Sequence, residues 1–530
     1  MKVYKHMFLA LVFIMAMSCQ SEQGSREPIS AWPQQGITYE IFVQSFYDSD
    51  GDSIGDINGM TQKLDYLQDL GAEAVWLMPI MPSPSYHKYD VTDYKGIHPD
   101  YGTMDDFKGF VQEAHNHNIK VVIDLIINHT SSEHPWFKSA TQDENSQYRN
   151  YYVWADKDSI ADQLAKKEVS FDSDNITQWH AVNGDTTAEH YYGFFYGGMP
   201  DLNYDNAKLR AEIYDIGRFW LQDVGVDGFR LDAAKHIYPD DRANDNHEFW
   251  REFRAEMEKV KPDVYLVGEV WANTDIQAPY AEGFSALFNF DLAFSILETL
   301  NKEVNVSAAI TGHGWTTNEK GSIVNNYTGG QEKFKQYNPE FAIATFLSNH
   351  DQNRVMSVLN NDMEKAKAAA SILLTLPGAP YLYYGEEIGM RGLKPDEHIR
   401  EPFLWEAAAN DKGRAQWIKP QFTTDESVKP LSEQMEDPNS LFNHYKKMIA
   451  LRRGSDVLTY GDIEMVEHPN PALLVFKRTY KGQELLVVHN VSGEEQSLEG
   501  LPEGFDEIYK FFDEGTPQNS LNAYESTILN

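Results

Sequence analysis

The stretch that decides the fold is Val226-Asp-Gly-Phe-Arg-Leu-Asp232, which is followed by Ala-Ala-Lys-His. Its apolar and charged residues alternate as in a β-strand, so Phe229 and Leu231 point to one face while Arg230 and Asp232 point to the other. The stretch therefore predicts a buried strand that ends in charged side chains. Such a strand end is typical of the functional face of a β/α barrel.

Seven further stretches share this character, and each is followed by a segment with helical periodicity. Together with the first, the predicted strands are Ile37–Val43, Ala74–Pro79, Ile119–Ile127, Val226–Asp232, Val264–Glu269, Ala286–Asp291, Phe341–Ser348 and Ala379–Tyr384. One of the helices is expected over Asn58–Leu70, where apolar residues recur every three or four positions before Gly71. Eight strands that alternate with helices predict the α/β class and, within it, a (β/α)8 TIM barrel.

Two departures from this regular spacing predict additional domains. About 100 residues separate the third strand from the fourth, and this segment is rich in Tyr, Trp, Asn and Asp without clear periodicity. We therefore expect an inserted domain over residues 130–204, which divides the barrel into 34–129 and 205–454. Beyond Gly454, two β-rich stretches with turn residues between them predict a C-terminal all-β domain, a β-sandwich over residues 455–530.

The first 19 residues resemble a bacterial lipoprotein signal peptide. Lys2 and Lys5 precede an apolar run that is too short to span a bilayer, and Ala16-Met-Ser-Cys19 resembles a lipobox. We expect a lipid on Cys19 after cleavage and a polar tether over residues 20–33. These features predict export and an anchor in the bacterial cell envelope, on the periplasmic or the outer side of the outer membrane. The alternative is an ordinary signal peptide with an incidental cysteine.

The composition of the chain narrows the class of partner. The 45 basic and 81 acidic residues give a net charge of −36, and this field repels nucleic acid and anionic lipid. Cys19 is the only cysteine, so the chain forms no internal disulfide and no zinc–thiolate site. A neutral ligand suits the chain, and we expect no nucleic-acid partner.

Polar clusters occur at four of the predicted strand ends, where a barrel places its reacting groups. Asn128-His129 ends the third strand, Asp232 the fourth and Glu269 the fifth, while His350-Asp351 follows the seventh. Asp232 shares a face with Arg230, and a guanidinium favours the ionised carboxylate that a nucleophile requires. Two carboxyl groups facing one glycosidic oxygen are the minimal machinery of glycoside hydrolysis. The third carboxyl and the two histidines could bind sugar hydroxyls.

These clusters resemble, in order and in position, the four signature regions of the α-amylase family, glycoside hydrolase family 13. Met199-Pro-Asp-Leu-Asn203 resembles a fifth region at the end of the inserted domain. The resemblance covers roughly residues 36–525. It implies a retaining hydrolase of starch-like α-glucans and maltooligosaccharides, with Asp232 as nucleophile, Glu269 as general acid/base and Asp351 as the carboxylate that holds ring hydroxyls in the transition state.

The same resemblance assigns residues around the reacting glucose. Arg230, His129 and His350 are expected to line its subsite, and Tyr89 is expected to stack on its ring. Tyr89 belongs to His87-Lys-Tyr-Asp90, where the family more often has glycine in place of Lys88.

The residues after the nucleophile favour α-1,4 bonds. Ala233-Ala-Lys235-His236 is similar to α-amylases in which Lys and His contact glucose units beyond the cleavage point, whereas α-1,6-acting members usually have Val where Ala233 stands. Trp271 is expected to form a platform on the leaving-group side, and the alternative is a core tryptophan that caps the fifth strand. The leading interpretation is an α-amylase. The alternatives are a neopullulanase- or cyclomaltodextrinase-like enzyme, a 4-α-glucanotransferase and, outside catalysis, a glucan-binding barrel.

One acidic motif predicts a calcium site. Residues 48–56 read Asp-Ser-Asp-Gly-Asp-Ser-Ile-Gly-Asp, with carboxylates at alternate positions and glycines for a tight turn. Ca²⁺ takes six to eight oxygen ligands. The motif resembles the calcium loop after the first strand in some family members, and the alternative is an acidic turn in solvent. The expected ligands are Asp48, Asp50, Asp52, Asp56 and the carbonyl of Ile54.

Overall fold

A computed structural model describes residues 32–530 except 34, 166–176, 188, 312–313, 408–409, 506 and 510–518. Eight parallel strands form a closed barrel in the order β1-β13-β12-β9-β8-β7-β3-β2. Each strand lies inside a stretch that was predicted as a strand, so the TIM barrel is confirmed. The strands are β1 (Thr38–Ile41), β2 (Ala74–Leu77), β3 (Lys120–Leu125), β7 (Gly228–Leu231), β8 (Tyr265–Gly268), β9 (Ala286–Phe288), β12 (Ala342–Thr345) and β13 (Ala379–Tyr383).

Strand β7 shows why these sequences form a barrel. Phe229 packs outward against Phe253 of α8 (Ala243–Glu258), with ring centroids 6.4 Å apart, whereas Arg230 is fully buried inside the barrel. The parallel register pairs Arg230 with Asp124 of β3. Opposite charges therefore meet in the barrel interior, and the outward-facing residues supply the apolar contacts to the helices.

Helices follow the strands around the barrel. The helix predicted over Asn58–Leu70 is instead two helices, because the backbone turns at Lys63 (φ −105°, ψ 9°). Gly71 ends the second one in the left-handed conformation (φ 98°), as predicted. The helices between β1 and β13 include α1 (Val43–Phe46), α2 (Ile57–Gln62), α3 (Leu64–Leu70), α4 (Met104–Asn116), α7 (Ala207–Arg218), α8, α9 (Thr274–Gln277), α10 (Phe290–Lys302), α11 (Ile323–Lys335), α12 (Val355–Val358) and α13 (Met363–Thr375). After β13 come α14 (Asp396–Ile399), α15 (Leu431–Glu436) and α16 (Leu441–Gly454).

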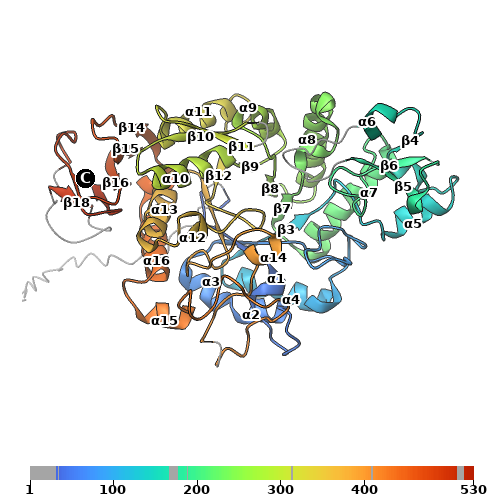
Figure 1. Cartoon of the computed structure of the whole chain (residues 1–530), viewed down its shortest axis with the longest axis horizontal. Helices are drawn as coiled ribbons and strands as arrows, with labels where there is room; N and C mark the ends of the chain where they lie inside the picture. The colour runs from blue at the N-terminus through green and yellow to red at the C-terminus, as the bar shows by residue number, and fades with distance from the viewer. Residues whose placement is uncertain are drawn as a thin grey trace, which may run out of the picture.

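The segment between β3 and α7 forms the inserted domain that the spacing predicted. It holds a three-stranded antiparallel sheet in the order β4-β6-β5, which lies at the right of Figure 1. A β-bridge from His129 to Asp201 ties the end of this segment to the end of β3. Its elements are α5 (Pro135–Gln142), β4 (Trp154–Ala155), α6 (Ala161–Ala165), β5 (Trp179–Ala181) and β6 (His190–Tyr192).

The C-terminal region lies on the opposite side of the barrel (Figure 1). It begins with a helix, α17 (Asp456–Tyr460), so the predicted all-β region becomes β-structure only from Asp462. The strands β14 (Asp462–Met465), β15 (Leu473–Tyr480), β16 (Gln483–Asn490) and β19 (Ser526–Leu529) form one antiparallel sheet, and β17 (Gln496–Ser497) pairs with β18 (Ser520–Leu521). One face of the larger sheet joins the main core through Leu474 and Val487, and the other buries Val475 and Val488 beside Leu521 of the small sheet.

The predicted signal peptide, Cys19 and the tether up to residue 31 lie outside the described residues. Among the helices that the structure does describe, none combines the length and the apolar character needed to cross a membrane.

Candidate active site

The ends of three barrel strands bring carboxyl groups to one pocket. Asp232 follows β7, Glu269 follows β8, and Asp351 lies six residues beyond β12. The backbone N–H of Ala233 donates to Glu269 Oε2 over 3.1 Å, which ties two neighbouring strand ends together. The pocket has a volume of about 440 Å³. It is lined by His87, Tyr89, His129, Phe195, Tyr196, Met199, Asp232, Ala233, Lys235, His236, Glu269, Trp271, Asp351, Lys394, Asp396 and Arg400.

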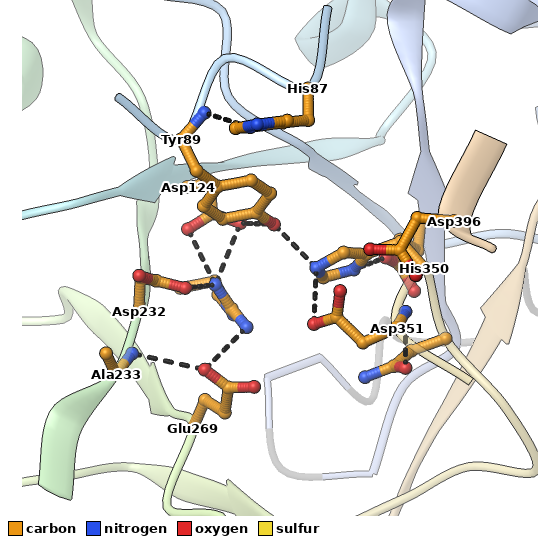
Figure 2. A network of polar contacts seen from close by, with 12 residues as sticks. His87, Tyr89, Asp124, Asp232, Ala233, Glu269, His350, Asp351 and Asp396 are labelled. Carbon is orange, nitrogen blue, oxygen red and sulfur yellow. Dashed lines mark hydrogen bonds and ion pairs between the residues drawn. The ribbon is translucent and has the colours of Figure 1, made fainter. Parts of the chain in front are cut away.

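Arg230 organises the carboxyl groups from beneath the pocket. Figure 2 shows Asp124, Asp232 and Glu269 turned toward one guanidinium group. One terminal nitrogen of Arg230 lies 2.6 Å from Asp232 Oδ1 and 3.0 Å from Asp124 Oδ1, and the other lies 3.0 Å from Glu269 Oε2. The guanidinium is buried with its partners, where such pairing is needed to offset the loss of hydration. A single cation therefore fixes two pocket carboxyls in one geometry.

Two of these carboxyl groups hold their protons more tightly than free acids do. Burial raises the pKa of Glu269 to about 7, although Arg230 opposes the shift. Asp232 and Asp351 add to it, because a nearby negative charge disfavours ionisation. Burial also raises the pKa of Asp124 to about 7, again against the influence of Arg230. Glu269 can therefore carry a proton near neutral pH and donate it to a group in the pocket.

The third carboxyl belongs to a second polar network. His350 Nε2 lies 3.0 Å from Asp351 Oδ2, and His350 Nδ1 lies 2.5 Å from Glu40 Oε1. Burial alone would lower the pKa of His350, but the two carboxylates raise it to about 10. Burial would raise the pKa of Asp351, but His350 and Arg400 hold it well below its usual range. Arg400 also fixes Asp351 through a contact of 2.9 Å. This network presents an ionised carboxylate opposite Glu269.

The structure brings together the residues that the sequence analysis assigned to substrate. Tyr89, His129, Lys235, His236 and Trp271 line the pocket beside the three carboxyls. Arg230 and His350 are fully buried and do not line it, so both act through the side chains that they hold.

Tyr89 and His129 are tied to each other and to the barrel floor. The Tyr89 hydroxyl lies 2.6 Å from His350 Nε2 and donates to Asp124 Oδ2 over 3.0 Å. Its ring lies nearly parallel to the His350 imidazole, with centroids 5.4 Å apart. His129 Nε2, which was expected to face sugar hydroxyls, lies 3.1 Å from the Tyr89 carbonyl oxygen. In this structure His129 therefore holds the backbone of Tyr89.

The backbone at Lys88 adopts a conformation that suits glycine better than lysine. Lys88 adopts a left-handed conformation with φ 63°, which costs most for a residue with a Cβ. Its side chain is buried, and its ammonium donates to Gln44 Oε1 over 3.3 Å and lies 4.7 Å from the Tyr101 ring centroid. Burial lowers the pKa of Lys88 to about 8, against the opposing influence of Asp100. This side chain offsets the backbone strain and holds the loop that carries Tyr89.

Trp271 combines features of the two roles that the sequence allowed, a platform in the pocket and a core tryptophan. It lines the pocket, and its ring also packs on Phe290 at the start of α10, with centroids 4.1 Å apart and an angle of 58°. The tryptophan is therefore half-buried, with part of its ring available in the pocket.

The acidic loop after β1 gathers three of its four aspartates. Oxygen atoms of Asp48, Asp50 and Asp56 all lie within 4.8 Å of one another. Asp52 was expected to join them but is not part of this group, and its Oδ1 accepts the N–H of Ile54 over 2.8 Å. The loop turns through Gly51 (φ 86°), and this turn directs Asp52 into a local hydrogen bond. Two ligands on opposite sides of Ca²⁺, at 2.3–2.6 Å each, are at most about 5 Å apart, so the three carboxylates fit that ion.

Several pocket residues were not predicted. Phe195 and Tyr196 come from the inserted domain, whose irregular sequence gives no periodicity to read. Asp396 begins α14 and Arg400 follows that helix, in the segment after β13, and the two pair over 3.1 Å. Their position after the last strand could have identified these two residues as candidates, because loops at the carboxyl-terminal ends of barrel strands build the functional face.

Comparisons with known proteins agree with this geometry. The sequence model of the α-amylase catalytic domain matches residues 40–461, and that of the α-amylase SusG C-terminal domain matches residues 473–528. The chain is 43% identical to "Alpha-amylase 3" of Dictyoglomus thermophilum, covering 91% of this chain and 89% of the relative. It is 34% identical to a 4-α-glucanotransferase of Thermotoga neapolitana, covering 88% of this chain and 98% of that relative. The crystal structure of an α-amylase from H. orenii is similar to this chain with a TM-score of 0.81 and 39% identity. The match covers 93% of this chain and 99% of that structure.

Proposed function

The chain belongs to the α-amylase family of glycoside hydrolases, and from that premise we propose that it cleaves α-1,4-glucosidic bonds of starch-like glucans and maltooligosaccharides with retention of configuration. One observation carries the proposal. Asp232 and Glu269 are held by the two terminal nitrogens of one guanidinium, at 2.6 Å and 3.0 Å, and both line the same pocket. Two carboxyl groups so close together suit a retaining mechanism, which leaves no room for a water between them.

The two carboxyls differ in the way that a double displacement requires. Asp232, paired with Arg230, attacks the anomeric carbon while Glu269 gives its proton to the departing glycosidic oxygen. A glycosyl ester on Asp232 results. Glu269, now ionised, then takes a proton from water as the water oxygen attacks the same carbon and releases Asp232. Asp351 holds ring hydroxyls during both steps.

The experiment that tests this proposal is a time course of products from amylose, pullulan and cyclodextrin. We expect new reducing ends on amylose, and none in Asp232→Asn at the same protein concentration. Preference for pullulan or cyclodextrin over amylose would contradict the α-amylase assignment and favour the neopullulanase- or cyclomaltodextrinase-like alternative. A chain that binds amylose but neither yields reducing ends nor changes the chain lengths of the glucan would favour the glucan-binding barrel.

A second candidate function has a specific observation in its favour. The relative from Thermotoga neapolitana that shares 34% identity over nearly its whole length is a 4-α-glucanotransferase. Transfer uses the same ester on Asp232 but resolves it with a sugar hydroxyl in place of water. Incubation with maltotriose separates the two, since transfer yields longer chains without a net rise in reducing ends.

We also propose that the acidic loop binds Ca²⁺ through Asp48, Asp50 and Asp56. The oxygens of these residues are close enough to surround one cation. The loop is also fixed to the segment after β13, since Asp48 N–H donates to the Gly413 carbonyl over 2.8 Å. A bound cation would therefore stabilise a junction between distant parts of the chain. The test is a calcium titration of thermal stability.

We further propose that the protein is exported and anchored through a lipid on Cys19. The lipobox-like sequence supports this proposal. Replacing Cys19 with Ala should release active protein from the membrane fraction, whereas retention of the variant in that fraction would refute the anchor.

A further inference from the structure

Trp315 is an exposed aromatic residue beside the candidate active site. It lies on β11 (Gly314–Asn318), which pairs with β10 (Ser307–Thr311) to form a hairpin over α10 (Figure 1). Its side chain is 48% exposed, and among the described residues no other tryptophan is exposed. Its ring stacks on Phe294, with centroids 4.4 Å apart and an angle of 8°. One face of the indole is therefore supported from within the protein, and the remainder meets solvent.

The hairpin holds Trp315 next to the loop that carries Glu269. Trp315 pairs across the hairpin with Ile310, whose carbonyl oxygen accepts from Asn273 Nδ2 over 3.4 Å. Asn273 lies two residues beyond Trp271 and four beyond Glu269. Asp291 reinforces the junction, because its carboxylate accepts the N–H of Ile310 over 2.7 Å and that of Thr274 over 2.9 Å. Trp315 is therefore positioned at the rim of the barrel, on the side of the proton donor.

Aromatic packing on two neighbouring turns of α10 relates the pocket wall to this exposed surface. Trp271 packs on Phe290, Phe290 and Phe294 lie one turn apart on α10, and Phe294 stacks on Trp315. Ile276, on α9 three residues beyond Asn273, is also 48% exposed. Apolar side chains are therefore accessible in the pocket, at Trp271, and outside it, at Trp315 and Ile276.

We propose that Trp315 is a binding platform for an α-glucan chain that extends out of the pocket on the leaving-group side. The apolar face of a pyranose can pack on the open face of the indole, and Phe294 keeps that face rigid. The proposal rests on the proposed function, because the pocket must hold the same chain. It implies that long glucans gain an additional contact that short maltooligosaccharides cannot reach.

Steady-state kinetics on two substrate lengths test this platform. Trp315→Ala should lower kcat/KM for amylose by about two- to tenfold, the range that one aromatic contact provides, and should leave kcat/KM for maltotriose unchanged. Trp315→Phe should stay near the parent. The matched control is Tyr337→Ala, an exposed aromatic between α11 and β12 at the opposite end of the barrel. An equal loss on both substrates, or no loss on amylose, would overturn the proposal.

Amylose retardation in native gels separates failure of the platform from failure of the proposed function. If the parent hydrolyses neither substrate, the proposed function is wrong, and the gel then tests Trp315 by itself. Retardation of the parent and of Tyr337→Ala that is lost in Trp315→Ala supports a glucan platform. Equal retardation of all three proteins overturns it.

Discussion

Removal of the Arg230 guanidinium should destabilise the fold as well as the site. Arg230→Met keeps the length of the side chain but leaves Asp124, Asp232 and Glu269 buried without their shared cation. Breaking a buried ion pair by removing one partner costs about 3–5 kcal/mol. With an unfolding entropy of about 2.1 cal/mol/K per residue, a chain of 530 residues loses about 1 °C of Tm per kcal/mol. Calorimetry at pH 8 should therefore show a Tm about 3–5 °C below that of the parent.

The pH dependence of this loss follows from the carboxyl groups. The folded-state pKa values of Asp124 and Glu269, both about 7, exceed their unfolded values of about 4, so protonation favours the folded state. Stability from this source is present at low pH and is lost as pH rises toward 7. Without Arg230 both pKa values rise further, so the pH range over which this stability is lost extends above 7. The Tm deficit of Arg230→Met should therefore shrink at pH 5.

Two variants control this experiment. Arg242 pairs with Asp205 over 2.8 Å but is 38% exposed, so Arg242→Met should lower Tm by about 1 °C or less. Adding Asp124→Asn to Arg230→Met should recover part of the lost Tm, because it removes one uncompensated charge. A Tm for Arg230→Met equal to that of Arg242→Met, at both pH values, would refute the reasoning.

Three further predictions concern acidity, cation binding and backbone strain. Because Glu269 must carry its proton to act and its pKa is about 7, kcat/KM should fall as pH rises through about 7, and a profile that stays flat to pH 9 would contradict its role as the acid. Asp50→Ala should abolish the rise of Tm on calcium addition while Asp52→Ala retains it, and an equal calcium response in both variants would reject the three-carboxylate site. Lys88→Gly should have a Tm about 1–2 °C above that of Lys88→Ala, since only glycine accepts a φ of 63° without strain, and the reverse order would show that strain is not the controlling term.

The sequence could predict the barrel because its signals are local. The spacing of Arg230 and Asp232 places both on one face of β7, and β7 leads directly to the pocket. The lengths of the helices were harder to predict from the sequence. The break at Lys63 accompanies contacts of its ammonium with the rings of Tyr47 and Trp405, at 3.9 Å and 4.2 Å, and Trp405 is hundreds of residues away. The recurrence of apolar residues every three or four positions in the helix sequence gives no information on a contact with so distant a residue.

The site shows the same division between local and distant signals. Asp232, Glu269 and Asp351 stand at or just after strand ends and could be predicted individually. Asp351 is also held by residues that are distant in sequence, since Glu40 on β1 contacts His350 and Arg400 after β13 contacts Asp351 itself. Only the closed barrel brings these segments together. The roles of the carboxyls could therefore be inferred from the family resemblance, but their electrostatics could not.

The anomeric configuration of the first product tests the central claim most directly. If Asp232 forms an ester with the anomeric carbon, the two carboxyls are about 5–5.5 Å apart and a second displacement restores the starting configuration. NMR of a fresh maltooligosaccharide digest should then show the α-anomer first, before mutarotation. Asp232→Asn should reduce turnover on the scale of roughly 10⁴–10⁶-fold. Initial release of the β-anomer would require a separation of about 6.5–9.5 Å with an intervening water, and would contradict the assignment of both carboxyls.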